Sequence, residues 1–176
     1  TSTELDFQRS GSLRLQFLLE SLADLKKSLQ LLGADLIIRI GNPAEILSSM
    51  AEELKVDIIH YSKEVAHEEQ IDIQRLEQKV LGKGILLNGF WQSTLFHEDD
   101  VPWPVKQVPD VFTRFRKESE KTVQVHDEYP APQQINYQEE IDPGKILSLD
   151  DLRVETRARS KKSVLDFKGG ESAAWE

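Results

Sequence analysis

Apolar residues recur at steps of three and four near the start of the chain, at positions 15, 18, 22, 25, 29 and 32. This spacing places them on one stripe and predicts an amphipathic helix of about five turns. Gly33 then supplies the left-handed residue that commonly ends a helix. Residues 36–40 read Leu-Ile-Ile-Arg-Ile, a run typical of a strand that is covered on both faces. The pattern predicts a helix followed by a buried strand.

The same alternation continues to residue 90. Asn42 and Pro43 have the residue types of a helix cap and first helical position, and the helix that follows is expected to end near Lys55. Residues 57–61 and 85–90 predict two more strands, separated by a helix from 68 to 81 whose inward face is Ile73, Leu76 and Val80, with Leu81 as a further candidate. Helices alternating with strands predict an α/β fold, a Rossmann-like parallel sheet with flanking helices.

The character of the sequence changes after one further predicted helix at 110–121. Residues 118–176 contain Pro130, Pro132 and Pro143 and few apolar pairs. A segment of this composition is a connector rather than a second core. We therefore expect an α/β domain over residues 1–121 and an extended linker over residues 122–176.

Charge and composition narrow the possible functions. The chain has 22 basic and 31 acidic residues, a net charge of −9, which disfavours a nucleic-acid binder that acts alone. The absence of cysteine excludes disulfides, thiolate metal sites and cysteine nucleophiles, and the four histidines lack metal-site spacing, so we expect no metal. Apolar runs are too short for a membrane span, so we expect a soluble chain with no membrane partner. Its compartment is not assigned, except that a bacterial chain of this kind is expected in the cytoplasm.

Ligands of open parallel sheets bind at the carboxyl ends of the strands, which here are followed by residues 41–42, 62–64 and 91–94. Helix capping explains Asn42 better than phosphate binding does, because no glycine-rich phosphate loop is present. Glu64 follows a buried strand, and its carboxylate can accept paired N–H bonds from a planar heterocycle. A solvated rim charge is the alternative. Glu68 lies in the first turn of the next helix, where negative charge suits the helix dipole.

Two other constellations are weaker. Ser93, His97 and Asp99 or Asp100 have the residue types of a hydrolase triad, but Ser93 does not lie in a nucleophile-elbow sequence. One histidine beside exposed carboxylates is a poor metal site. Trp91 and Trp103 are expected to pack the loop after the third strand onto the sheet, with stacking on a ring-shaped ligand as the alternative.

Five segments, read in order, carry a resemblance: FLLESLADL at 17–25, RIGNPAEIL at 39–47, FWQSTLFHEDD at 90–100, PDVFTRFRK at 109–117 and FKGGESAA at 167–174. Together they resemble the photolyase/cryptochrome family, and within it the DASH cryptochromes. The resemblance implies that this chain corresponds to the N-terminal antenna domain and linker of a longer flavoprotein. The helical FAD domain of that protein would follow the present sequence.

The resemblance also implies cofactors, partners and site residues. The whole protein would bind FAD and, as an antenna, methenyltetrahydrofolate, and would use blue light to repair pyrimidine dimers in damaged DNA or to sense light. Glu64, and after it Glu68, match the carboxylate that engages the folate ring. The resemblance places no catalytic residue in this chain, so we expect the chain alone to be inactive and to bind no flavin. The helical FAD domain, absent or separately encoded, is the implied partner.

One departure from the family has a structural consequence. The family's first two strands have no counterpart here, and the family order 3-2-1-4-5 places them between strands 36–40 and 57–61. We expect one of three outcomes. The strands 36–40 and 57–61 pair directly with each other, another chain donates a strand in a strand-exchanged oligomer, or the sequence is an excerpt of a longer molecule. An independent α/β interaction module without flavin remains the alternative function.

Overall fold

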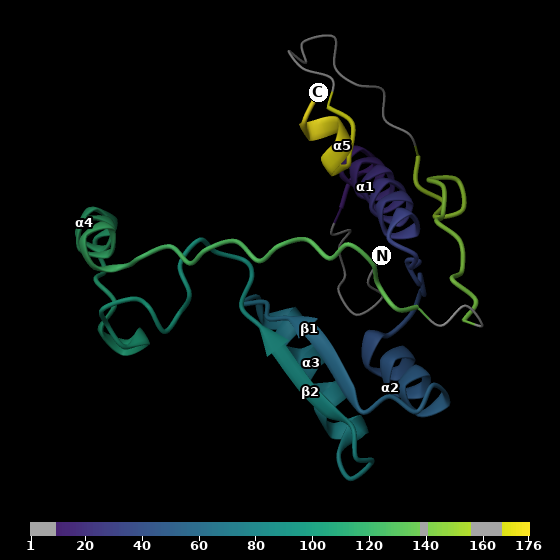
Figure 1. Ribbon diagram of the computed structural model, residues 1–176, viewed down its shortest axis with the longest axis horizontal. Helices are drawn as coiled ribbons and strands as arrows, with labels where there is room; N and C mark the ends of the chain where they lie inside the picture. The colour runs from purple at the N-terminus through teal and green to yellow at the C-terminus, as the bar shows by residue number, and fades with distance from the viewer. Residues whose placement is uncertain (1–9, 138–140, 156–166) are drawn as a thin grey trace. The chain divides into compact units, whose positions relative to one another are not determined.

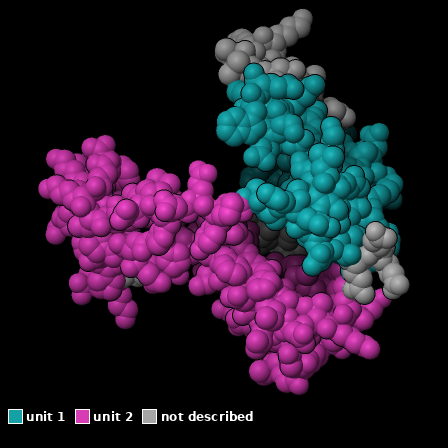
Figure 2. All heavy atoms as spheres, viewed as in Figure 1, with its two compact units in different colours: residues 1–39, 131–176 teal, residues 40–130 magenta. Residues whose placement is uncertain are grey.

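The computed structural model describes residues 10–137, 141–155 and 167–176. The chain divides into two compact units, residues 1–39 with 131–176 and residues 40–130 (Figure 2). Part of the predicted linker, residues 138–140 and 156–166, lies outside the described residues. Each unit is described by itself below.

The unit of residues 40–130 contains a parallel two-stranded sheet. Strands β1 (Ile58–Ser62) and β2 (Leu86–Phe90) pair with Ile58 opposite Leu86 and Ser62 opposite Phe90. Helix α2 (Pro43–Glu53) precedes β1, and helix α3 (His67–Val80) connects the two strands and crosses behind them (Figure 1). The sheet and its helices confirm the predicted α/β class.

Helix α2 begins where the sequence indicates. The Asn42 side chain accepts a hydrogen bond from the Glu45 N–H at 3.2 Å, and Pro43 is the first helical residue. This cap satisfies one of the donors that a helix N-terminus leaves free, and proline costs nothing there because its missing N–H has no intrahelical partner. The capping interpretation of Asn42 is confirmed.

A small apolar core lies between one face of the sheet and the helices. Its buried members are Ala44, Leu76 and Val80, and its half-buried members are Ile59, Ile85 and Leu87. The alternation along β1 and β2 leaves the opposite face exposed, where Leu86 keeps 64% of its surface accessible. Leu81 is 82% exposed because α3 ends at Val80, so its predicted place on the inward face is wrong.

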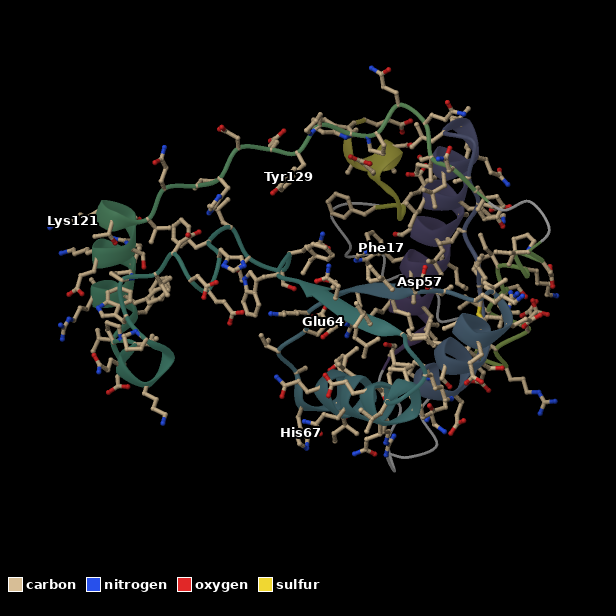
Figure 3. The ribbon with its side chains drawn as sticks, turned by 60° about the horizontal axis from the view of Figure 1, so that its bottom comes forward. Phe17, Asp57, Glu64, His67, Lys121 and Tyr129 are labelled. Atoms are coloured by element: carbon tan, nitrogen blue, oxygen red, sulfur yellow. The ribbon has the colours of Figure 1, made fainter. Side chains whose placement is uncertain are left out.

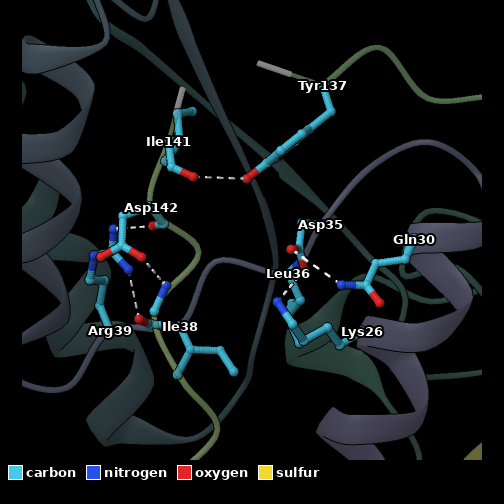
Figure 4. A network of polar contacts seen from close by, with 10 residues as sticks. Lys26, Gln30, Asp35, Leu36, Ile38, Arg39, Tyr137, Ile141 and Asp142 are labelled. Carbon is cyan, nitrogen blue, oxygen red and sulfur yellow. Dashed lines mark hydrogen bonds and ion pairs between the residues drawn. The ribbon is translucent and has the colours of Figure 1, made fainter. Parts of the chain in front are cut away.

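Residues 36–40, the first of the three predicted strands along the chain, are described by the structure but do not form a strand. The Ile38 N–H donates to the Pro143 carbonyl at 2.8 Å, and the Arg39 guanidinium donates to the Asp142 carbonyl at 2.6 Å (Figure 4). A β-branched run becomes a strand only where a neighbouring strand satisfies its backbone groups. Here the segment contacts a loop instead, so the prediction of a strand at 36–40, and of its direct pairing with 57–61, is wrong.

The unit of residues 1–39 and 131–176 is built on helix α1 (Ser12–Leu31). The helix ends as predicted, because Gly33 has φ +81° in the left-handed region. The short helix α5 (Glu171–Ala174) lies against α1 (Figure 1). A Glu20 side-chain oxygen accepts the Gly169 N–H at 2.7 Å, and an Asp24 side-chain oxygen accepts the Ser172 N–H at 3.0 Å.

The docking of α5 is expected to depend on pH. The backbone hydrogen bond from Ser172 lowers the pKa of Asp24 below its ordinary value of 3.8. A lowered folded-state pKa stabilises docking above the unfolded pKa of about 3.9, and this stabilisation is lost as the pH falls through the folded value. In an NMR titration, the chemical shift of the Ser172 amide should change with a midpoint below pH 3.8, and Asp24→Asn should abolish this change. A midpoint at or above 3.8 in the native chain would contradict the bond.

Helix α4 (Phe112–Thr122) packs on the loop that precedes it. The Trp103 ring lies 5.6 Å from the Phe115 ring, and its indole N–H donates to Glu118 at 3.1 Å. Arg114 also donates to Glu118 at 2.8 Å, and this bond lowers the pKa of the Glu118 carboxyl. Trp103 is therefore a packing residue, but its partners Phe115 and Glu118 lie on α4, whereas the prediction placed its packing on the sheet.

Candidate functional site at the carboxyl end of the sheet

Lys63 connects the two loops that follow β1 and β2. Its N–H donates to the Phe90 carbonyl at 2.8 Å, and its own carbonyl accepts the Ser93 hydroxyl at 3.4 Å. Its ammonium group lies 3.6 Å from a Glu98 side-chain oxygen. The loop of residues 91–98 is thus held beside the residue that precedes Glu64.

Gly89 makes room for this arrangement. A side chain at position 89 would place its Cβ 2.6 Å from the Tyr61 ring and 2.9 Å from Lys63 Cγ. Both distances are far shorter than a van der Waals contact of about 3.5–4.0 Å. The glycine in β2 therefore allows the end of β1 and its side chains to lie close to the neighbouring strand.

Glu64 lies at the carboxyl end of β1, opposite the end where Asp57 lies (Figure 3). Its side chain is exposed, and the neighbouring Val65 is 65% exposed. An exposed carboxylate beside an apolar side chain can accept two parallel N–H bonds from a planar ring while the apolar group contacts the ring. The position agrees with the place predicted from the sequence, and the role of Glu64 in binding stays a prediction.

Glu68 is half-buried in the first turn of α3, one residue after His67 (Figure 3). Its carboxylate is stabilised there by the positive end of the helix dipole. The helix dipole is therefore sufficient to explain an acidic residue at position 68 without a ligand. A role in holding a ligand remains a prediction for Glu68 as well.

The triad residue types are not arranged as a triad. Ser93 donates to the Lys63 carbonyl, while His97 Nδ1 accepts the Asp99 N–H at 3.2 Å. A nucleophile and its base must share a hydrogen bond, and in the described residues these two side chains bond elsewhere. Among the residues that the structure describes, no three His, Asp or Glu side chains are grouped as metal ligands.

Sequence reasoning missed two features of this sheet end. One is Lys63, whose three contacts depend on residues 90, 93 and 98 and leave no pattern in the sequence. The other is the ring pair of His60 and Phe90 on the exposed sheet face, with centroids 5.5 Å apart. The alternation of exposed and half-buried residues along each strand predicts the face of the sheet on which each ring lies. Only the register between the two strands shows that the two rings are neighbours.

Comparisons with known proteins identify the family. The family model for DNA photolyase matches residues 2–133. Cryptochrome DASH of Gloeobacter violaceus is 38% identical over 167 residues, which are 95% of this chain and 33% of that protein. The crystal structure of Synechocystis sp. PCC6803 cryptochrome matches with a TM-score of 0.88 and 31% identity, covering 99% of this chain and 36% of that one.

A more distant structure shows the same fold. An archaeal photolyase from Sulfolobus tokodaii, solved with two FAD molecules, matches with a TM-score of 0.68 at 17% identity over 94% of this chain and 35% of that one. This chain spans about a third of the length of the curated relatives that it matches. None of the described helices is both long and apolar enough to cross a membrane. The chain belongs to the DNA photolyase family, and it has the N-terminal α/β domain fold of that family's DASH cryptochromes.

Proposed function

We propose that this chain supplies the antenna domain of a blue-light flavoprotein of the DASH type. In this proposal residues 1–121 form the α/β domain and residues 122–176 lead to a helical FAD domain. The observation that carries the proposal is the match to Synechocystis cryptochrome, which covers 99% of this chain but 36% of that one. The remaining length of the relatives is then where the flavin is bound, and the chain alone is inactive.

The proposed whole protein uses FAD to repair pyrimidine dimers in damaged DNA or to sense blue light. FAD would be held by the helical domain, which is also the part expected to contact DNA. The charge of this chain supports that division, because a net charge of −9 gives it little attraction for phosphate. The proposal also includes a strand-exchanged oligomer, in which a strand of another chain pairs with the edge of β1 that lies away from β2.

The antenna would be methenyltetrahydrofolate, with Glu64 as its main contact and Glu68 as a second. Glu64 fits such a ligand because its carboxylate is exposed beyond the sheet, next to a loop fixed through Lys63. The folate would supply light absorption at this site. The chain's part is to orient one edge of the ring by accepting its N–H groups.

A chimera tests the proposed function. This chain would replace the matching third of the Gloeobacter violaceus protein, and the purified chimera would be examined for flavin absorbance. We expect the chimera to be yellow and the chain alone to be colourless. A folded chimera without flavin would contradict the antenna-domain proposal and favour the independent interaction module.

The same chimera tests Glu64. Glu64→Gln is expected to weaken folate binding about tenfold or more, because hydrogen bonds to a charged group contribute about 1.5–3 kcal/mol. Flavin content should not change. Glu53→Gln, at an exposed position on α2, is the matched control and should leave folate binding unchanged. Folate fluorescence titrations measure both, and equal affinity in the two variants would remove Glu64 from the site.

A further inference from the structure

The segment that carries Glu64 lies between a strand and a helix and belongs to neither. β1 ends at Ser62 and α3 begins at His67, with Glu64 between them (Figure 3). The regular hydrogen bonds of strands and helices therefore do not fix the backbone here. Within the part of the chain that the structure describes, the Glu64 carboxylate forms no hydrogen bond or ion pair. Its direction thus depends on how the backbone on either side of it is held.

A side chain holds the backbone just before Glu64. The Ser93 hydroxyl donates to the Lys63 carbonyl at 3.4 Å, and this carbonyl belongs to the peptide group that joins Lys63 to Glu64. The Lys63 N–H donates to the Phe90 carbonyl at 2.8 Å, so the preceding peptide group is held as well. Because peptide groups are planar, two held planes fix both backbone dihedral angles of Lys63. The position of the Glu64 Cα is thereby set.

A second side chain holds the backbone just after Glu64. The Gln70 side-chain amide, in α3, donates to the Val65 carbonyl at 3.3 Å. The Gln70 N–H donates to the Ala66 carbonyl at 3.1 Å as part of the helix, so this donor is carried on a regular element. The carbonyls on the two sides of Glu64 are therefore each bound by a side chain, one from the loop after β2 and one from α3.

The loop that carries Ser93 is itself braced. The Trp91 indole N–H donates to Thr94 Oγ1, and the Thr94 hydroxyl donates to the Phe96 carbonyl, both at 2.6 Å. The two bonds span residues 91–96 and enclose Ser93. The Ser93 hydroxyl thus reaches Lys63 from a turn that has its own hydrogen bonds.

We propose that Ser93 and Gln70 are positioning residues for the Glu64 carboxylate. The inference rests on the proposed antenna site, in which Glu64 accepts the N–H groups of a planar ring. Neither residue needs to contact that ring, because each binds a backbone carbonyl beside Glu64 and keeps the carboxylate in place. A carboxylate that is already in place binds more tightly, since the ligand does not have to overcome the entropy of ordering the segment.

The ordering of Glu64 is measurable without a ligand. Backbone ¹⁵N relaxation gives the order parameter of the Glu64 amide, about 0.85 for a rigid backbone and below about 0.6 for a flexible one. We expect a rigid Glu64 in the native chain and a flexible one in the double variant Ser93→Ala/Gln70→Met. Two controls should stay rigid: Ser93→Thr keeps the hydroxyl, and Gln74→Met makes the glutamine change at an exposed position one turn later on α3. A flexible Glu64 in the native chain, or unchanged order in the double variant, would overturn the proposal.

The same variants in the chimera with the Gloeobacter violaceus protein test the consequence for binding. In fluorescence titrations, methenyltetrahydrofolate should bind about threefold more weakly to each single variant and about tenfold more weakly to the double variant. Ser93→Thr and Gln74→Met should bind it as the native chimera does. Equal affinity in the native chimera and the double variant would overturn the positioning role and leave the antenna function in place. A native chimera that binds no folate would contradict the antenna function itself, and this inference with it.

Discussion

Leu76→Ala is expected to lower the free energy of unfolding of the 40–130 unit by about 3 kcal/mol, within the range of about 2–5 kcal/mol for such changes. Leu76 is 1% exposed and packs in the small core with Ala44 and Val80. Removing its side chain loses apolar burial and leaves a cavity that the sheet and helices cannot fill. In so small a core this is a large part of the total stability.

Leu81→Ala is the matched control. Leu81 follows the end of α3 and is 82% exposed, so the same chemical change removes almost no buried surface. Its effect is expected to stay within about 0.5 kcal/mol. Urea unfolding followed by circular dichroism measures both variants. Similar losses for Leu76→Ala and Leu81→Ala would show that the core is not packed as described.

Gly169→Ala is expected to release α5 from α1. A Cβ at position 169 would lie 2.1 Å from the Phe17 carbonyl oxygen and 2.9 Å from the Ser21 backbone nitrogen. These are backbone atoms of a long helix, so the segment must move away from α1. The Glu20 and Asp24 carboxylates then lose the N–H groups of Gly169 and Ser172.

The release is measurable as amide hydrogen exchange. A clash of this kind costs about 1–3 kcal/mol. A cost of about 2 kcal/mol would make hydrogen exchange at the Ser172 amide roughly thirtyfold faster. Gly11→Ala is the control, because nothing lies within 4 Å of a Cβ at that position. Unchanged Ser172 exchange in Gly169→Ala would mean that α5 does not dock on α1 through the described contacts.

The helices were predictable because their signals are local. The apolar stripe from Leu15 predicts α1, Gly33 predicts its end, and Asn42 with Pro43 predicts the start of α2. The predicted strands 57–61 and 85–90 agree with β1 and β2 within a residue at their ends. The end of α3 was harder, because the apolar spacing continues to Leu81 after the helix has ended at Val80.

The site was predictable only in part. Ligands of open parallel sheets bind at the carboxyl ends of the strands, which predicts a site after β1, and Glu64 lies there. The contacts of Lys63 with the loop after β2 were not predictable, because they join residues far apart in the sequence. That Ser93 bonds to Lys63 and not to His97 likewise depends on how the two loops meet.

The sequence by itself determined the helices, the two paired strands and the resemblance to the photolyase family, since spacing, caps and turn residues act over a few positions. Only the tertiary structure decided whether residues 36–40 form a strand, since a strand requires a neighbour for its backbone groups. The segment is rich in β-branched residues, yet its Ile38 N–H reaches Pro143, far along the chain. The same requirement leaves one edge of β1 without a strand partner among the described residues, because hydrogen bonds between strands depend on which segments meet and not on the residues of one segment alone.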